Sequence, residues 1–180
     1  MDFQTSLVLS SSNADGPAST TLYSNAPGAG VYSEGLLVVL GQQLSKQLAQ
    51  SWQWLLGHDA TPLAHTAFGD FFFWSQKHES VFYFETQRGK STFVDRSTEW
   101  FFEQFIPQSS VLEQVLELTK VRQLVERLGA IAYGSCFIAE PWQCIGGSGT
   151  LNDYSIGNIA VYNSLVAQHV HGVMSGLRKA

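Results

Sequence analysis

The sequence contains two cysteines and five histidines, residue types that often supply a nucleophile and its base. Cys144 would have such a base if the fold brought a histidine to it, and the candidates are His58, His65 and His78. Nothing in the residues around Cys144 resembles an activated thiol site, and a buried, inert cysteine is the commoner case. A small cysteine-dependent hydrolase that uses Cys144 therefore stays an alternative interpretation.

The remaining polar candidates do not have the spacing of a metal site. His169 and His171 lie two residues apart in a segment expected to be helical, so they project from different faces, whereas helical zinc ligands are spaced i, i+4. Asp70, Asp153 and Asn158 fall in separate loops without ligand spacing. We therefore predict neither a metal nor another cofactor.

The glycine-rich run Gly146-Gly-Ser-Gly149 has the composition of a phosphate-binding loop. No Lys-Ser or Lys-Thr pair follows it, and its spacing is not that of a P-loop. Glycines in such a run more often permit a tight turn that needs a positive φ angle. Because no catalytic set emerges from these residues, we predict that the protein is not an enzyme.

The charge distribution points toward a protein partner. The net charge is −5, and residues 1–87 account for it with seven acidic residues against two lysines. Only 14% of the residues are charged, compared with about 25% in typical domains, which favours an exposed uncharged or aromatic docking face. A compact core under a Ser/Gln/Asn-rich surface explains the same composition. No basic stripe of the kind that binds nucleic acid is present.

The sequence shows neither a secretory signal nor a membrane span, so we expect a cytoplasmic protein. The N-terminus has an acid at position 2 and no basic region before its short apolar run, so it does not resemble a secretory signal. No run approaches the roughly 18 apolar residues of a membrane span. Two cysteines are too few for a disulfide framework. We expect no membrane association.

Residues 1–31 are rich in Ser, Ala, Gly, Pro and Thr, and we expect them to form an irregular N-terminal arm. Turn clusters occur at 13–17 and 26–30. Apolar side chains within this segment could fasten parts of it to the body: Leu7, Val8, Leu9, Leu22 and Tyr23. Residues 32–180 are predicted to form a single α+β domain.

The first half of that domain is predicted to be a helix followed by a β meander. Ser33 can cap the helix and Gly57 can end it, with leucines and Trp52 at helical spacing between them. Aromatic and β-branched residues then predict strands at 66–74, 81–86 and 91–94. The run Phe71-Phe-Phe-Trp74 lacks alternation, which suggests a strand that is covered on both faces.

Helices dominate the second half. Ser97 can cap a short helix that Pro107 stops, and Ser110 with Glu113 forms a capping box for a longer helix that ends at Gly129. A strand at 130–139, a loop at 140–154 and a helix at 158–173 follow. The inner face of the last helix is expected to consist of Ile159, Tyr162, Leu165, Val166 and Val170. The order α-βββ-αα-β-α predicts an α+β fold in which helices pack on a mainly antiparallel sheet.

Two segments carry a resemblance to a known family. The "FGD" tripeptide Phe68-Gly69-Asp70 comes first, and a "GGS" segment with Trp142, Gly146, Gly147, Ser148 and Gly149 follows, succeeded by Asp153 and Asn158. In this order the motifs, spread over about residues 36–170, resemble the GAD-like immunity family of bacterial type VI secretion. The resemblance implies an immunity protein without catalysis or cofactor, which neutralises a cognate effector toxin, often a DNase. An adaptor or chaperone of the secretion apparatus is a further alternative.

The implied partner is a basic nuclease domain, and an acidic inhibitor would complement its nucleic-acid cleft. Expected contacts are the acids near the predicted hairpin and the helix after it, with two aromatic anchors: Glu79, Glu85, Asp95, Glu99 and Glu103, with Trp74 and Tyr83. The motif glycines permit tight backbone paths, and Asp70, Asp153 and Asn158 can cap turns or helix starts. The motif residues could alternatively belong to the docking face.

Overall fold

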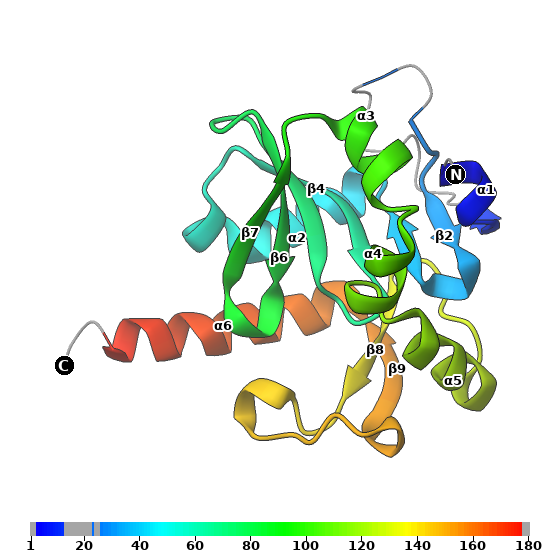
Figure 1. Cartoon of the computed structure of the whole chain (residues 1–180). Helices are drawn as coiled ribbons and strands as arrows, with labels where there is room; N and C mark the ends of the chain where they lie inside the picture. Colours follow the sequence, from blue (N-terminus) through cyan, green and yellow to red (C-terminus); the bar gives the residue numbers. More distant parts are fainter. Residues whose placement is uncertain (1–2, 13–22, 24–25, 178–180) are drawn as a thin grey trace.

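The computed structural model describes residues 3–12, 23 and 26–177, and its main element is a seven-stranded antiparallel sheet (Figure 1). Its strands lie in sequence order, so each strand pairs with the strands that precede and follow it along the chain. The strands are β1 Leu9–Ser12, β2 Gly30–Tyr32, β3 Leu37–Val39, β4 Ala60–Thr66, β5 Phe71–Ser75, β6 Ser80–Glu85 and β7 Lys90–Asp95.

Helices cover both faces of this sheet. One face carries α2 (Gln42–Leu56) and α6 (Ile159–Leu177). The other carries α1 Phe3–Ser6, α3 Thr98–Trp100, the π-helical turn Phe101–Phe105, α4 Ser109–Gln114 and α5 Leu118–Leu128. Strand β5 explains why two cores form. Phe71 and Phe73 point toward α2 and α6, whereas Phe72 points toward Phe101, and all three phenylalanines are buried. The prediction of a strand that is covered on both faces is confirmed.

A separate two-stranded sheet pairs β8 (Ser135–Ala139) with β9 (Tyr154–Asn158). The loop between them contains the glycine-rich run and two short 3-10 turns, at Gln143–Ile145 and Leu151–Asp153. In Figure 1 this hairpin lies below the large sheet and beside α5. The arrangement as a whole confirms the predicted α+β class, with a larger sheet than the sequence suggested.

Several boundaries predicted from the sequence are correct. Ser97 caps α3 by accepting a hydrogen bond from the Trp100 amide at 3.0 Å. Gly57 and Gly129 follow α2 and α5 directly, with φ angles of 86° and 87° that favour glycine. The turn before β7 places Gly89 in the left-handed region, as expected for a hairpin.

The predicted helix start at Ser33 is wrong. Residues 36–40 form a fully buried apolar run, and part of it is the central strand β3. Short apolar runs of this length fit a buried strand as well as a helix. Helix α2 begins only at Gln42, after Gly41. Strand β4 also escaped prediction over most of its length because it contains Pro62, which lies at a β-bulge.

The predicted capping box at Ser110 and Glu113 does not form. Helix α4 begins at Ser109 without a side-chain cap and ends at Gln114. Glu117 adopts a left-handed conformation (φ 54°), and α5 begins after it, so two short helices replace the single predicted one. Strand β9 occupies residues assigned to loop and helix, and Leu165 on α6 is 46% exposed instead of facing inward.

The expectation of an irregular arm at 1–31 is wrong for its described ends. Phe3 and Leu7 are buried in the core, β1 pairs with β2, and residues 30 and 31 belong to β2. Leu22 and the turn cluster at 13–17 lie outside the described residues. Within the described part of the chain, no helix has the length and hydropathy required to traverse a bilayer.

Candidate functional site

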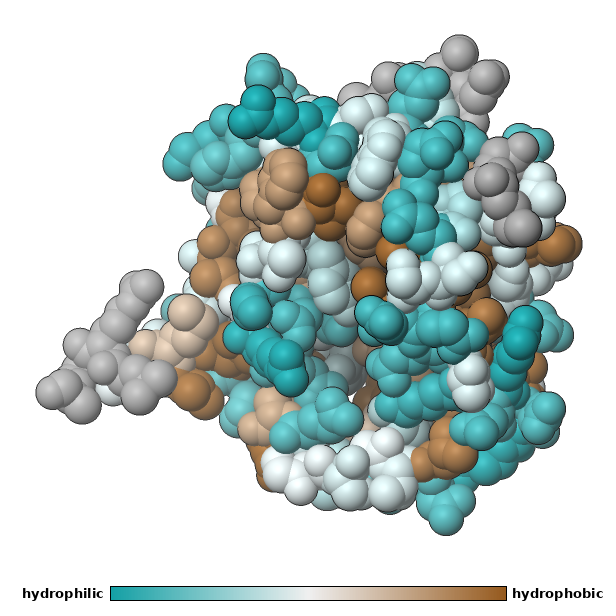
Figure 2. Space-filling model, viewed as in Figure 1, coloured by the Kyte–Doolittle hydropathy of each residue, from teal (hydrophilic) through white to brown (hydrophobic). Residues whose placement is uncertain are grey.

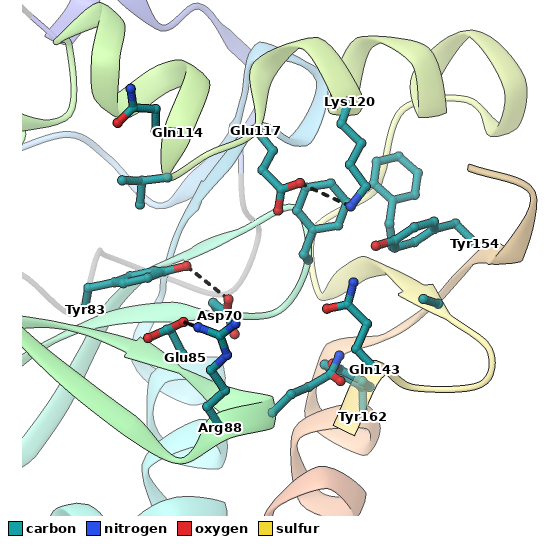
Figure 3. A pocket seen from close by; sticks show the side chains of 15 residues that line it. Asp70, Tyr83, Glu85, Arg88, Gln114, Glu117, Lys120, Gln143, Tyr154 and Tyr162 are labelled. Carbon is teal, nitrogen blue, oxygen red and sulfur yellow. Dashed lines mark hydrogen bonds and ion pairs between the residues drawn. The ribbon is translucent and has the colours of Figure 1, made fainter. Parts of the chain in front are cut away.

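The FGD segment and the β8–β9 hairpin, whose loop carries the GGS segment, meet at one pocket, which we call the Asp70 pocket (Figure 3). Its volume is about 310 Å³. Its walls come from the FGD turn before β5, from β6 and the β6–β7 turn, from the α4–α5 junction, from the β8–β9 hairpin and from α6. Segments from position 68 to position 162 therefore contribute to a single cavity.

Backbone geometry places Asp70 in this pocket. The FGD turn closes through a hydrogen bond from the Thr66 amide to the Asp70 carbonyl at 2.8 Å. Gly69 has a φ of 88°, and a Cβ atom there would lie 2.7 Å from the Tyr162 ring on α6. Glycine is thus required both by the backbone conformation and by the close approach of α6.

The Asp70 carboxylate is held by neutral donors. Its Oδ1 accepts hydrogen bonds from the amide and the hydroxyl of Thr86, both at 2.8 Å, and its Oδ2 accepts one from the Tyr83 hydroxyl at 3.0 Å. Burial raises the pKa of Asp70 above its ordinary value, although these hydrogen bonds act in the opposite direction. No cation contacts this carboxylate among the described residues.

The two cations of the pocket are already paired with other acids. Arg88 lies 2.8 Å from Glu85, and Lys120 lies 3.1 Å from Glu117. The Lys120 ammonium also lies over two aromatic rings, 4.6 Å from the Phe68 centroid and 4.8 Å from the Tyr154 centroid. Lys120 therefore links α5 to Phe68 of the FGD turn and to Tyr154 of β9, and Figure 3 shows Glu117, Lys120 and Tyr154 side by side.

A chain of hydrogen bonds joins α6 to the β8–β9 loop across one wall of the pocket. The Gln87 side chain donates to the Tyr162 hydroxyl at 2.7 Å, and its carbonyl accepts from the Cys144 amide at 2.9 Å. Burial raises the pKa of Tyr162, so its hydroxyl stays protonated. These hydrogen bonds fix the β8–β9 loop relative to the large sheet.

The GGS segment, residues 146–149, is shaped mainly by its own contacts. Asp153 accepts hydrogen bonds from the Thr150 amide at 2.9 Å and the Thr150 hydroxyl at 2.8 Å, and also from the Ser148 hydroxyl. A Cβ on Gly147 would lie 1.8 Å from the Pro141 carbonyl oxygen. The hydrogen bond from Ser148, followed by those from Thr150, lowers the pKa of Asp153.

The last two motif residues also act on the fold. The Trp142 ring contacts the edge of Tyr162, with ring centroids 5.9 Å apart. Asn158 accepts a hydrogen bond from the Val161 amide at 3.0 Å and caps α6. Of the motif residues, Phe68 and Asp70 line the Asp70 pocket, while Gly149 borders an adjoining groove that Glu113, Glu117 and Lys120 share.

Only two of the seven predicted contact residues line the pocket: Tyr83 and Glu85. Glu79 and Glu99 are exposed elsewhere, and Trp74 is partly buried against the core. The other two predicted acids are engaged within the fold. Asp95 accepts from the Ser97 amide at 2.8 Å, and Glu103 accepts from the Tyr23 hydroxyl at 3.3 Å.

Sequence reasoning missed Glu117, Lys120 and Tyr162 as site residues. Glu117 and Lys120 have the appearance of ordinary charged residues on a helix, and only the break before α5 turns them toward the pocket. Tyr162 was assigned to the inner face of the last helix, where it does pack, but its hydroxyl reaches the pocket wall. The spacing of the aromatic residues does not indicate that the Tyr162 hydroxyl reaches the pocket.

Both cysteine thiols have a raised pKa, whereas an activated thiol has a lowered one. Burial raises the pKa of Cys136 to about 12 and also raises the pKa of Cys144. A nucleophilic cysteine instead needs a lowered pKa. Within the part of the chain that the structure describes, no group of three or more His, Cys, Asp or Glu side chains is placed to hold a metal ion.

The sequence matches no protein-family model and no curated protein. The fold is similar to that in the crystal structure of Atu4351 from Agrobacterium tumefaciens, with a TM-score of 0.56 and 14% sequence identity. The similarity covers 78% of this chain and 70% of that chain. At this identity, the likeness defines a shared α+β fold and nothing more.

Proposed function

We propose that this chain is a cytoplasmic immunity protein of the GAD-like type. In this proposal it binds a cognate type VI secretion effector, a nuclease of the DNase class, and neutralises it by protein–protein docking. The protein has no catalytic role of its own in this proposal. The observation that carries it is the charge balance of the Asp70 pocket, where carboxylates outnumber cations and both cations are already paired.

The pocket therefore supplies a local negative potential. Asp70, Glu85 and Glu117 line it together with Arg88 and Lys120, and the adjoining groove adds Glu113. Nucleases bind polyanions through basic surfaces, so an acidic concavity complements them. Such complementarity speeds encounter and disfavours wrong partners.

The same face of the molecule offers apolar surface. Figure 2 shows hydrophilic side chains over α5 and the β6–β7 turn, and apolar side chains over the upper part of β7. Phe93 on β7 is 55% exposed and Trp100 on α3 is 38% exposed. Exposed aromatic residues beside acidic groups are typical anchors of a protein interface. An interface that extends this way also includes Glu99.

The direct test is to purify the chain with the product of the adjacent gene and to titrate nuclease activity. We expect a stable complex and complete loss of activity at stoichiometric amounts. The double variant Glu85→Gln and Glu117→Gln should weaken binding, whereas Glu126→Gln, an exposed acid on α5 that does not line the pocket, serves as the matched control.

Two outcomes would overturn the proposal. If both proteins are folded and do not bind, the immunity function is rejected. If the complex forms but the effector stays fully active, the chain is an adaptor or chaperone instead. Replacing Cys144 by Ser addresses the hydrolase alternative, because a variant that protects as well as the parent excludes a role for that thiol.

A further inference from the structure

We infer that the Asp70 pocket binds the side chain of a single arginine from the partner protein, with the Asp70 carboxylate as its principal acceptor. This inference rests on the proposed function, because it names the group through which a basic partner engages the pocket. It follows from the free acceptor sites, the charge balance and the aromatic walls of the cavity.

The Asp70 carboxylate retains acceptor capacity. An incoming cation favours the ionised form of Asp70. In that form the carboxylate has about four lone-pair sites, and the described hydrogen bonds use two on Oδ1 and one on Oδ2. One site on Oδ2 therefore stays open in a residue that lines the cavity. Figure 3 shows Tyr83 reaching the carboxylate from one side of the pocket.

The Asp70 carboxylate has no positively charged partner among the described residues. Its three hydrogen bonds come from neutral donors, and even a half-buried carboxylate is less favourable without a cation beside it. Arg88 and Lys120 do not provide the missing charge because they pair with Glu85 and Glu117. A cation of the partner protein would supply this positive charge. Its charge-assisted hydrogen bond to Asp70 Oδ2 would be stronger than the hydrogen bonds from the neutral donors.

The walls favour a guanidinium group over an ammonium group or a metal ion. Five aromatic rings line the cavity; Phe68 and Tyr83 are half-buried, whereas Phe137, Tyr154 and Tyr162 are buried. A guanidinium is planar and weakly hydrated, so it stacks on such rings while donating hydrogen bonds at its edge. The amides of Gln87 and Gln143 and the carboxylates of Glu85 and Glu117 offer further acceptors. At about 310 Å³, the volume is at the small end for ligand sites and suits one side chain.

The test uses the isolated protein and a small probe. N-acetyl-arginine methylamide is titrated while the ring signals of the tyrosines are followed by NMR, and N-acetyl-lysine methylamide is titrated in parallel. We expect saturable shifts at Tyr83 and Tyr162 with the arginine probe, and binding weaker by about tenfold or more for the lysine probe and for Asp70→Asn. Equal shifts with both probes, or none with either, overturn the inference.

Asp70→Asn could disturb the turn, so a second variant keeps the test decisive. Glu117→Gln leaves the FGD turn intact, removes one acceptor and should weaken the arginine probe, whereas Glu126→Gln should not. If the parent neutralises the effector and both pocket variants do so equally well, the inference fails while the proposed function stands. If the arginine probe binds but the effector is not neutralised, the proposed function fails while the pocket assignment stands.

Discussion

At the scale of single residues, the polar side chains of His65 and Asn163 are fully buried between the large sheet and the helices α2 and α6. Each has a measurable consequence. His65 on β4 donates from Nδ1 to the Thr66 carbonyl at 2.8 Å, and its Nε2 has no hydrogen-bond partner among the described residues. Asn163 on α6 accepts from the Trp52 indole at 2.8 Å and donates to the Gly69 carbonyl at 3.2 Å. Asn163 thereby ties α2 and α6 to the FGD turn.

The pH dependence of stability should contain a contribution from His65. Burial lowers the pKa of His65 from 6.5 to about 4, so the unfolded chain takes up a proton in this range while the folded chain does not. Folding stability should therefore fall as the pH drops below 6.5 and reach its full loss near pH 4. Between about pH 7 and pH 5 the loss from this residue should be about 2 kcal/mol.

Urea denaturation of the parent and of His65→Phe at both pH values measures this contribution. The variant should show a smaller loss of stability on acidification than the parent, whatever its stability at neutral pH. His78→Gln, which replaces an exposed histidine, should retain the parent's slope. An identical slope for the parent and His65→Phe would contradict the assignment.

Asn163→Ala should lower the free energy of unfolding by about 1–3 kcal/mol, because it leaves the buried Trp52 indole without an acceptor. It also removes the donor to Gly69, so the arginine probe should bind more weakly. Ser164→Ala, at the next residue of α6, is the matched control. Chemical denaturation monitored by tryptophan fluorescence measures the change, and a loss no larger than in the control would refute the bridging role.

At this scale the sequence allowed part of the site to be predicted. The sequence singles out the FGD segment and predicts Tyr83 and Glu85 at an interface, and the structure places Phe68, Asp70, Tyr83 and Glu85 in the candidate pocket. The GGS residues 146–149 are not part of its lining. Asp70 was expected only as a turn cap or a member of a docking face, since nothing in its neighbours shows that Thr86 and Tyr83 would surround it. Long-range partners of this kind are not encoded in local spacing.

At the scale of elements, the start of α6 depends on one side chain. Asn158→Ala removes the acceptor of the Val161 amide and should cost about 1 kcal/mol of stability. Asn158→Asp keeps an acceptor and places a negative charge at the helix N-terminus, so it should cost little. Thermal unfolding of the two variants beside the parent tests this, and equal destabilisation by both would argue against a capping role.

The sequence predicted elements well where a strong local signal existed and poorly where burial dominated. The β5–β7 meander and the ends of α2 and α5 carry turn and glycine signals, and they were found. Strand β3 was missed because its short apolar run is compatible with a helix as well. Strand β2 was missed because residues 30 and 31 belong to the Gly-, Ala- and Pro-rich stretch that predicted an irregular arm. The break between α4 and α5 was missed because the left-handed conformation of Glu117 is not expected for a glutamate.

At the scale of the whole molecule, the net charge of −5 should govern how fast a basic partner associates. Raising the salt concentration from about 0.05 M to about 0.5 M should slow association with the effector by about tenfold, while dissociation changes little. Stopped-flow or surface-based kinetics of the parent complex measures both rates. An association rate that is insensitive to salt would argue against a charged interface.

The GGS loop is the part of the pocket wall that depends least on the rest of the protein. Its shape is set mainly by Ser148, Thr150 and Asp153 within the loop, while the large sheet and both cores are built from other residues. Because the Cys144 amide and the Asn152 carbonyl also bond to Gln87 and Arg127, the part of the loop that can be exchanged with least effect on folding is residues 145–151. Sequence changes in this part of the loop would therefore alter the surface beside the pocket while leaving Asp70 and its hydrogen bonds in place.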